Sequence, residues 1–211
     1  MVKNSGRGQF KGRNTGSRKR NRIILMAAEG TNKTETQYFR KFSSDSTRIY
    51  FTSGNETDPQ KMMERLLKEC DDRGIGNEPG DRAFCLVDND VNLQKDIQIA
   101  VADTMAKKKS GIAEQIVSNP CFEVWYICHK DYSTKQYSSS NEVIEVTKRR
   151  FDGYKKEAPD MYEKTIADIN TACENAKKLE QHNLSLGRKP HTAAFLPSTE
   201  VYKVIEAILT T

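Results

Sequence analysis

The chain has 211 residues, of which 36% are hydrophobic and 30% are charged, an ordinary composition for a soluble globular protein. That length favours one domain with an appendage, or one large domain. Residues 1–22 hold eight of the 34 basic residues and no acid, so the remainder carries 26 basic and 29 acidic residues. The sequence therefore predicts a slightly acidic folded body with a basic tail.

Five cysteines without a close CxxC pair argue against a disulfide framework and against a zinc knuckle. We therefore expect a reducing compartment, the cytoplasm. The apolar run after the basic tail, Ile23 to Ala28, is too short for the core of a signal peptide. No stretch of the sequence is long and apolar enough to span a membrane.

Residues 1–21 are rich in Gly, Ser, Asn, Lys and Arg, and we expect this tail to be disordered. Three roles are open for it: a solubilising segment, a contact for a protein partner, or an electrostatic arm for phosphate backbones. The last role predicts an affinity that falls steeply with salt. Its candidate nucleic-acid-binding residues are Arg18, Lys19, Arg20 and Arg22.

The first half of the chain alternates short strands with helices. The apolar run 23–28 predicts a strand, followed by a helix for which Asn32 and Glu35 form a capping box. A second strand is expected over 48–52. Asp58 and Pro59 then predict the N-cap and first residue of another helix.

The apolar run Ala83 to Val87 is bounded by charges, as in a parallel strand buried on both faces. A helix over 93–108 and a strand over 112–117 should follow. The segment 121–129 is apolar nearly all round, which predicts a buried helix, with Asn119 as its N-cap.

The pattern changes after residue 130. Segments 141–156 and 161–181 predict charged, mostly exposed helices, and a last helix should start at Pro197-Ser198. The order of elements argues for an α/β fold with a largely parallel sheet flanked by helices. We divide the chain into a disordered tail (1–21), an α/β core (22–130) and a helical C-terminal extension packed on the core (131–211).

Three acids follow two of the predicted strands. In an extended chain the side chains of Asp88 and Asp90 would point the same way, and two adjacent carboxylates call for a cation. Glu29 ends the first strand, and functional crevices of open α/β sheets lie at the carboxyl ends of strands. Oxygen ligands without His or Cys favour Mg²⁺ or Mn²⁺, so these three residues are the candidate metal ligands.

Three other polar residues have both a structural and a functional interpretation. Glu123 either stabilises the start of its helix through the dipole or is a fourth acid at the metal site. His129 is read as a buried histidine bonded to a carbonyl, with a role as acid or base as the alternative. Lys33 lies at a helix start that attracts phosphate, and it is either a phosphate contact or a solvated lysine.

The arrangement of strand-Glu-Gly and strand-Asp-x-Asp resembles the Toprim domain of topoisomerases, DnaG-type primases and OLD-type nucleases. The segment Ser-Asn-Pro-Cys-Phe-Glu-Val-Trp-Tyr-Ile-Cys-His, residues 118–129, resembles a signature of RloB-type proteins, as does the opening from Ile23 to Glu35. The resemblance covers the chain from Arg22 onward. Two positions depart from the pattern, because Ala28 stands where family members often carry Cys and Asn89 occupies a variable middle position.

The resemblance implies a Toprim-fold nuclease of prokaryotic anti-phage defence, of the abortive-infection type, which often occurs beside an ABC/AAA-type ATPase. It implies metal binding by Glu29, Asp88 and Asp90, with Glu123 and Lys33 as further candidate catalytic residues. We therefore expect an Mg²⁺- or Mn²⁺-dependent endonuclease.

The substrate of that endonuclease is open between RNA, including tRNA, and DNA. A homodimer is also open. The first rival is a Toprim-like sensor or scaffold that binds metal or nucleotide without cleaving, which the acidic body favours. A nucleotidyl transferase of the primase type ranks below it, because the chain has no separate zinc or helicase-binding module.

Overall fold

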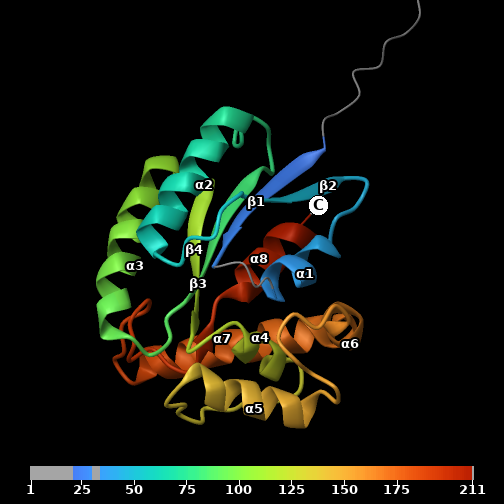
Figure 1. Cartoon of the computed structure of the whole chain (residues 1–211), viewed down its shortest axis with the longest axis vertical. Helices are drawn as coiled ribbons and strands as arrows, with labels where there is room; N and C mark the ends of the chain where they lie inside the picture. Colours follow the sequence, from blue (N-terminus) through green and yellow to red (C-terminus); the bar gives the residue numbers. More distant parts are fainter. Residues whose placement is uncertain (1–20, 30–33, 211) are drawn as a thin grey trace, which may run out of the picture.

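The computed structural model describes residues 21–29 and 34–210 of the chain (Figure 1). Residues 1–20 of the predicted disordered tail and the capping residue Asn32 lie outside these ranges. So do four candidate site residues, Arg18, Lys19, Arg20 and Lys33. All other predicted site residues lie within the described part of the chain.

One five-stranded sheet with the order β2-β1-β3-β4-β5 forms the centre of the molecule. The first four strands of this order are parallel, and β5 runs antiparallel to β4. The predicted α/β class and the largely parallel sheet are thus confirmed. The strands are β1 (Arg22–Ala28), β2 (Thr47–Phe51), β3 (Arg82–Asp88), β4 (Ala113–Asn119) and β5 (Ser198–Thr199).

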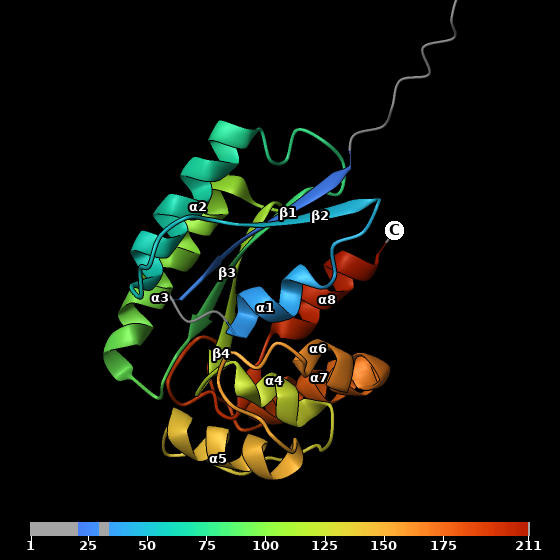
Figure 2. The same cartoon turned by 45° about the vertical axis from the view of Figure 1, so that its right-hand side comes forward.

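The two central strands alternate their side chains between two apolar layers. Leu25 of β1 and Cys85 of β3 face α2 (Pro59–Arg73) and α3 (Leu93–Ala106). Met26 of β1 faces the opposite layer, which includes α1 (Thr34–Arg40) and α8 (Val201–Leu209). Figures 1 and 2 show these helix pairs on opposite faces of the sheet. Burial on both sides explains why β1 and β3 are continuous apolar runs.

The remaining helices gather below the sheet in the view of Figure 2. They are α4 (Glu123–Cys128), α5 (Ser140–Arg150), α6 (Met161–Thr165) and α7 (Ile169–Ser185), with a 3₁₀ turn at Ile166–Asp168, whereas the 3₁₀ turn at Lys107–Lys109 follows α3. Their apolar side chains join those of β1 and α1 in one cluster. The C-terminal helical part therefore shares a hydrophobic core with the sheet.

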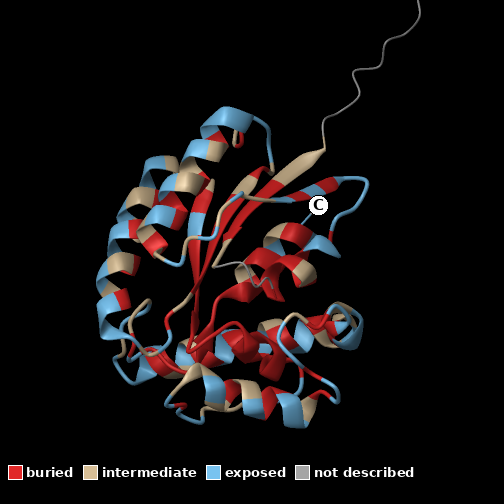
Figure 3. Cartoon of the chain, viewed as in Figure 1, coloured by how far each residue is buried: buried red, intermediate tan, exposed pale blue. Residues whose placement is uncertain are grey.

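The helix α4 is buried on every side, as its apolar sequence predicts (Figure 3). Trp125 is fully buried, and its Nε1 donates to the hydroxyl of Tyr38 in α1 at 3.1 Å. Tyr38 also meets Phe122 and Tyr126 edge-on, with ring centroids 5.9 and 5.6 Å apart. These contacts fix α4 and α1 against each other, and each of these helices begins with an acidic residue in its first turn.

One of three helix starts predicted from local sequence is confirmed, and two are wrong. Asp58 caps α2, since its Oδ1 accepts from the amide of Lys61 at 3.0 Å. The prediction that Asn119 caps α4 is wrong, because Asn119 ends β4 and its Nδ2 donates to carbonyls of the 192–195 segment. The predicted helix start at Pro197-Ser198 is also wrong, because Ser198 pairs with Asn119 in β5.

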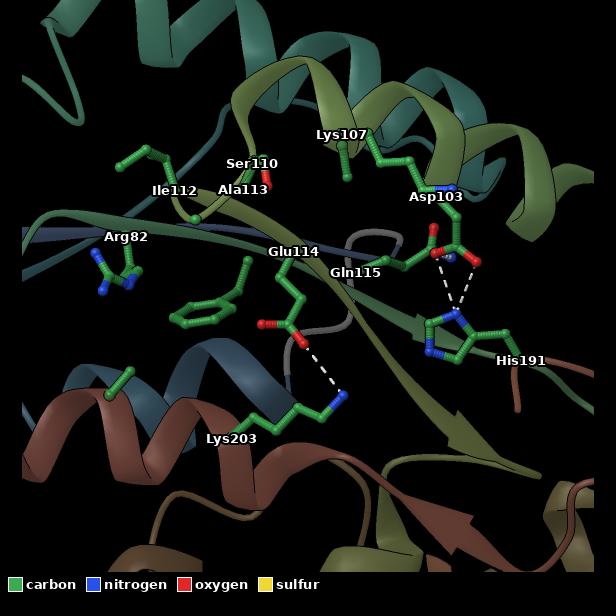
Figure 4. Close-up of a pocket in the computed structure, with 14 residues that line it drawn as sticks. Arg82, Asp103, Lys107, Ser110, Ile112, Ala113, Glu114, Gln115, His191 and Lys203 are labelled. Carbon is green, nitrogen blue, oxygen red and sulfur yellow. Dashed lines mark hydrogen bonds and ion pairs between the residues drawn. The ribbon is translucent and has the colours of Figure 1, made fainter. Parts of the chain in front are cut away.

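A partly buried ion cluster joins α3, the segment before β5, and β4, and Figure 4 shows its contact between His191 and Asp103. His191 Nδ1 lies 2.9 Å from Asp103 Oδ2, and its Nε2 lies 2.7 Å from Glu200 Oε2. Glu200 in turn accepts from the amide of Val117 at 3.0 Å. Burial alone would lower the pKa of His191, but its hydrogen bonds to both carboxylates outweigh this and raise the pKa to about 10. His191 is therefore protonated at neutral pH.

Replacement of His191 by Ala should lower the free energy of unfolding by about 2 kcal/mol at pH 7, because the buried carboxylate of Glu200 loses a charged hydrogen-bond partner. The pKa of His191 rises from 6.5 to about 10 on folding, so its protonation stabilises fully below pH 6.5 and this gain is lost toward pH 10. Urea unfolding at pH 7 and pH 9.5 measures both effects. His182→Ala in α7 is the control, and a wild-type advantage that does not shrink at the higher pH would contradict the assignment.

Candidate metal centre

Two strands bring acids to the carboxyl edge of the sheet. In the β1–β3 register Ala28 pairs with Leu86, so the next residue, Glu29, lies level with the end of β3. Asp88 is the last residue of β3. The predicted meeting of Glu29 with the Asp-x-Asp segment is thus present in the structure.

Asp88 lies at the electrostatic centre of the edge. Burial raises its pKa well above the ordinary value, and the negative charges of four other carboxylates raise it further. Those four are Glu35, Glu123, Glu29 and Asp90. Desolvation and repulsion by like charges act in the same direction here, so the cluster needs positive charge in order to stay ionised.

Lys95 of α3 supplies part of that charge. Its Nζ donates to both carboxylate oxygens of Glu29, at 3.0 and 3.1 Å, and to Asp90 Oδ2 at 2.9 Å. A fourth contact at 2.7 Å joins Nζ to the main-chain carbonyl of Asp88. Burial raises the pKa of Glu29 despite the ammonium beside it. Lys95 was not among the residues selected from the sequence.

The two aspartates reach the site in different ways. The strand ends at Asp88, and Asp90 adopts a left-handed conformation with φ of 58°. The alternation expected for an extended chain therefore does not apply. Asp90 is instead turned so that one oxygen meets Lys95 and the other accepts from the hydroxyl of Ser140 at 2.6 Å.

Asn89, between the two aspartates, stabilises this turn. Its side chain is fully buried, where Nδ2 donates to Asp96 Oδ1 at 2.9 Å and Oδ1 accepts from the amide of Asn92 at 3.2 Å. The polar middle residue of the Asp-x-Asp segment thus stabilises the turn between the two aspartates.

Glu123 lies in the first turn of α4 and is only 2% exposed. Its Oε1 accepts from the hydroxyl of Tyr154 at 2.8 Å. The charge of Glu123 also acts on Asp88, so it belongs to the acidic cluster as well as to the start of its helix. Glu123 can therefore both stabilise the start of α4 and act as a fourth acid of the site.

Glu35 is an acid of the cluster that sequence reasoning assigned to capping alone. It lies in the first turn of α1, and its pKa is raised to about 7, first by burial and then by the charges of Glu123 and Glu29. The available signal was its position, because the first turn of a helix that follows β1 lies near the edge at which β1 ends.

Lys156 is the second cation that faces the acids. It follows α5, and the charges of Glu123, Asp88 and Glu35 raise its pKa against the opposing effect of burial. The amide of the next residue, Glu157, donates to Thr34 Oγ1 at 3.3 Å and so ties this loop to α1. The C-terminal helical part therefore contributes to the site.

His129 and Arg22 lie away from the acidic cluster. His129 Nδ1 lies 2.9 Å from the carbonyl of Trp125, and burial lowers its pKa to about 4, as for a neutral core histidine. Arg22 begins β1, at the opposite end from Glu29. Its guanidinium donates to Thr47 Oγ1 and to the carbonyl of Ala207 at the end of α8, so this side chain holds the fold together.

The donor set suits a hard divalent cation in its chemistry. It consists of carboxylates and a main-chain carbonyl, without His or Cys, as Mg²⁺ and Mn²⁺ prefer. Within residues 21–29 and 34–210, no three His, Cys, Asp or Glu side chains stand in a ligating arrangement. The ammonium of Lys95 is the cation between Glu29 and Asp90 in this structure.

A pocket of about 630 Å³ lies at the other end of the strands (Figure 4). It is lined by Arg82 and Ala113, the first residues of β3 and β4, and by Lys203 of α8. Because these strands are parallel, the pocket and the acidic cluster lie at opposite edges of the sheet. The acids therefore do not belong to this pocket.

Comparison with known proteins identifies one family. The family model described as RloB-like protein matches residues 24–208, most of the chain. No curated protein and no solved structure matches the chain. In the described part of the chain, no helix has the length and apolar character needed to cross a membrane.

Substitution of Glu35 by Gln should stabilise the protein by about 2 kcal/mol at pH 8 in EDTA and have little effect at pH 5. The folded-state pKa of about 7 exceeds the ordinary 4.5, so the stabilisation by protonation is complete below pH 4.5 and lost as the pH rises through 7. Gln keeps the shape without the charge. Denaturant unfolding at both pH values tests this, with Glu64→Gln, an exposed residue of α2, as control. Destabilisation at pH 8 would contradict it.

Proposed function

The chain belongs to the RloB-like family, and we propose that it is an Mg²⁺- or Mn²⁺-dependent endonuclease that hydrolyses phosphodiester bonds of nucleic acid. The observation that carries the proposal is the convergence of Glu29, Asp88 and Asp90 at the carboxyl edge of a parallel sheet. Active sites of open α/β sheets lie at this edge.

The charge balance of the edge supports a site for a cation. Five carboxylates, those of Glu29, Glu35, Asp88, Asp90 and Glu123, act on one another there. Two lysines, Lys95 and Lys156, face them. Burial and the neighbouring negative charges raise the pKa values of Glu29, Glu35 and Asp88, and a divalent cation would relieve this repulsion.

Glu29, Asp88 and Asp90 would hold the cation, which when bound would supply Lewis acidity toward a phosphoryl oxygen and would make water a better nucleophile. Asp90 is 44% exposed on its side chain and marks the open side of the cluster, where a phosphate can approach. Glu123 is buried behind it and is oriented by Tyr154. Lys156 opposes the accumulated negative charge when a phosphate enters.

The wider role proposed is that of an effector in anti-phage defence, acting with an ABC/AAA-type ATPase in the cytoplasm. The family and the basic N-terminal segment support a nucleic-acid substrate, RNA (tRNA included) or DNA. In this role Lys33, Arg18, Lys19 and Arg20 would contact phosphates.

A sensor that binds a metal or a nucleotide without cleavage is the second candidate function. The observation that favours it is the acidic character of the body, with 26 basic and 29 acidic residues beyond residue 22. A nuclease that acts alone usually presents a basic groove. Under this alternative the acids at the edge would bind the ligand and a partner would transmit the signal.

Cleavage assays separate the two functions. Wild-type protein should cleave at least one of labelled tRNA, single-stranded DNA and duplex DNA with Mg²⁺ or Mn²⁺, alone or with the partner ATPase, and EDTA should abolish cleavage. Asp88→Asn removes a metal ligand with little change in shape, and it should reduce the rate at least about 100-fold.

Asp71→Asn is the matched control, because Asp71 is an exposed aspartate on α2 whose partner is Lys109. Cleavage that survives replacement of both Asp88 and Asp90 would refute the site assignment. Nucleotide binding without cleavage of any substrate would favour the sensor.

A further inference from the structure

Lys95 stands in an unfavourable place for a lysine. It is the third residue of α3, whose N-cap is Asn92, so its charge lies near the positive end of the helix dipole. Its residue is only 9% exposed, which adds a desolvation penalty. Two separate effects thus oppose an ammonium at this position, and its four oxygen contacts must offset both.

Those contacts form a coordination shell made of oxygen atoms. Nζ lies 2.7–3.1 Å from the carboxylate of Glu29, the carboxylate of Asp90 and the carbonyl of Asp88. Carboxylate and main-chain carbonyl oxygens are also what Mg²⁺ and Mn²⁺ bind, at distances near 2.1 Å. An ammonium nitrogen and a divalent ion cannot both occupy the centre of this shell, because they overlap and repel each other.

The other acids near Lys95 are already hydrogen-bonded to other groups. Asp96, one residue further along α3, is already used by Asn89 and by the amide of Ala193. Glu123 is held by Tyr154. Glu29 and Asp90 have Lys95 as their ion-pair partner in the described part of the chain.

We propose that Lys95 is a built-in counter-cation that keeps the ligands of the metal centre together in the metal-free protein and is displaced when a divalent cation binds. This inference rests on the metal site of the proposed function and deepens it. Lys95 is a positioning residue in this scheme. It lowers the affinity for the metal, and it prevents the carboxylates from separating before the metal arrives.

The first test measures binding of Mn²⁺ alone by calorimetry. Lys95→Met keeps most of the side-chain length and removes the competing charge, so the Kd for Mn²⁺ should fall at least tenfold. In EDTA the variant should melt several degrees below wild type, since the carboxylates of Glu29 and Asp90 lose the ammonium that holds them together, and saturating Mn²⁺ should remove most of that difference. Lys177→Met, which breaks an exposed pair with Glu206, is the control and should leave the Kd unchanged.

The second test uses the wild-type protein, so it does not depend on the folding of a variant. An amine-reactive acylating reagent should label Lys95 slowly in EDTA, because the ammonium is buried and paired. Mn²⁺ should increase the labelling of Lys95 at least severalfold while Lys177 labelling stays constant. Peptide mass spectrometry measures both sites.

The outcomes separate this inference from the proposed nuclease activity. An unchanged or weaker Mn²⁺ affinity in Lys95→Met, or Lys95 labelling that does not rise with Mn²⁺, overturns the inference alone. If Mn²⁺ binds tightly and displaces Lys95 but no nucleic acid is cleaved, the inference about Lys95 is supported and the proposed nuclease activity is refuted. No Mn²⁺ binding by either protein overturns the inference and the metal centre together.

Discussion

The burial of several carboxylates at one sheet edge is the constraint on which the rest of the structure depends. Charges of one sign repel, and removal from water raises the free energy of each ionised group. Asp88 experiences both effects most strongly. The lysines Lys95 and Lys156 reduce the imbalance from opposite sides, one from α3 and one from the loop after α5. Because groups with strongly shifted pKa values cluster at functional sites, this edge is the candidate site of the protein.

The hydrophobic core explains how the acids stay in place. The α4 helix, which carries Glu123, is buried on all sides, and the Trp125–Tyr38 hydrogen bond joins it to α1, which carries Glu35. Most of the free energy of this arrangement comes from aromatic and aliphatic burial, about 1.5–3 kcal/mol for each large side chain. The favourable free energy of these apolar contacts therefore offsets the unfavourable free energy of the clustered charges.

The C-terminal helices are part of the site as well as part of the core. Tyr154 orients Glu123, Ser140 donates to Asp90, and the 151–160 loop meets α1 through Thr34. Beside β4, the cluster of Asp103, His191 and Glu200 attaches the segment before β5 to α3 and β4. Chain segments on both sides of residue 130 thus form one packed unit.

The sequence by itself determined most of the elements and the strand-end acids, because hydrophobic periodicity is local, but it missed β5. The apolar run before Asp88 specified a strand buried on both faces, Asp58-Pro59 specified a helix start, and the all-apolar segment around Trp125 specified a buried helix. Only the tertiary structure decided which distant charges share a space. Lys95 meets Glu29 across 66 positions of the chain, and the left-handed turn at Asp90 redirects a side chain that strand periodicity would have placed elsewhere. Such pairings depend on strand order and helix packing, which no local pattern encodes.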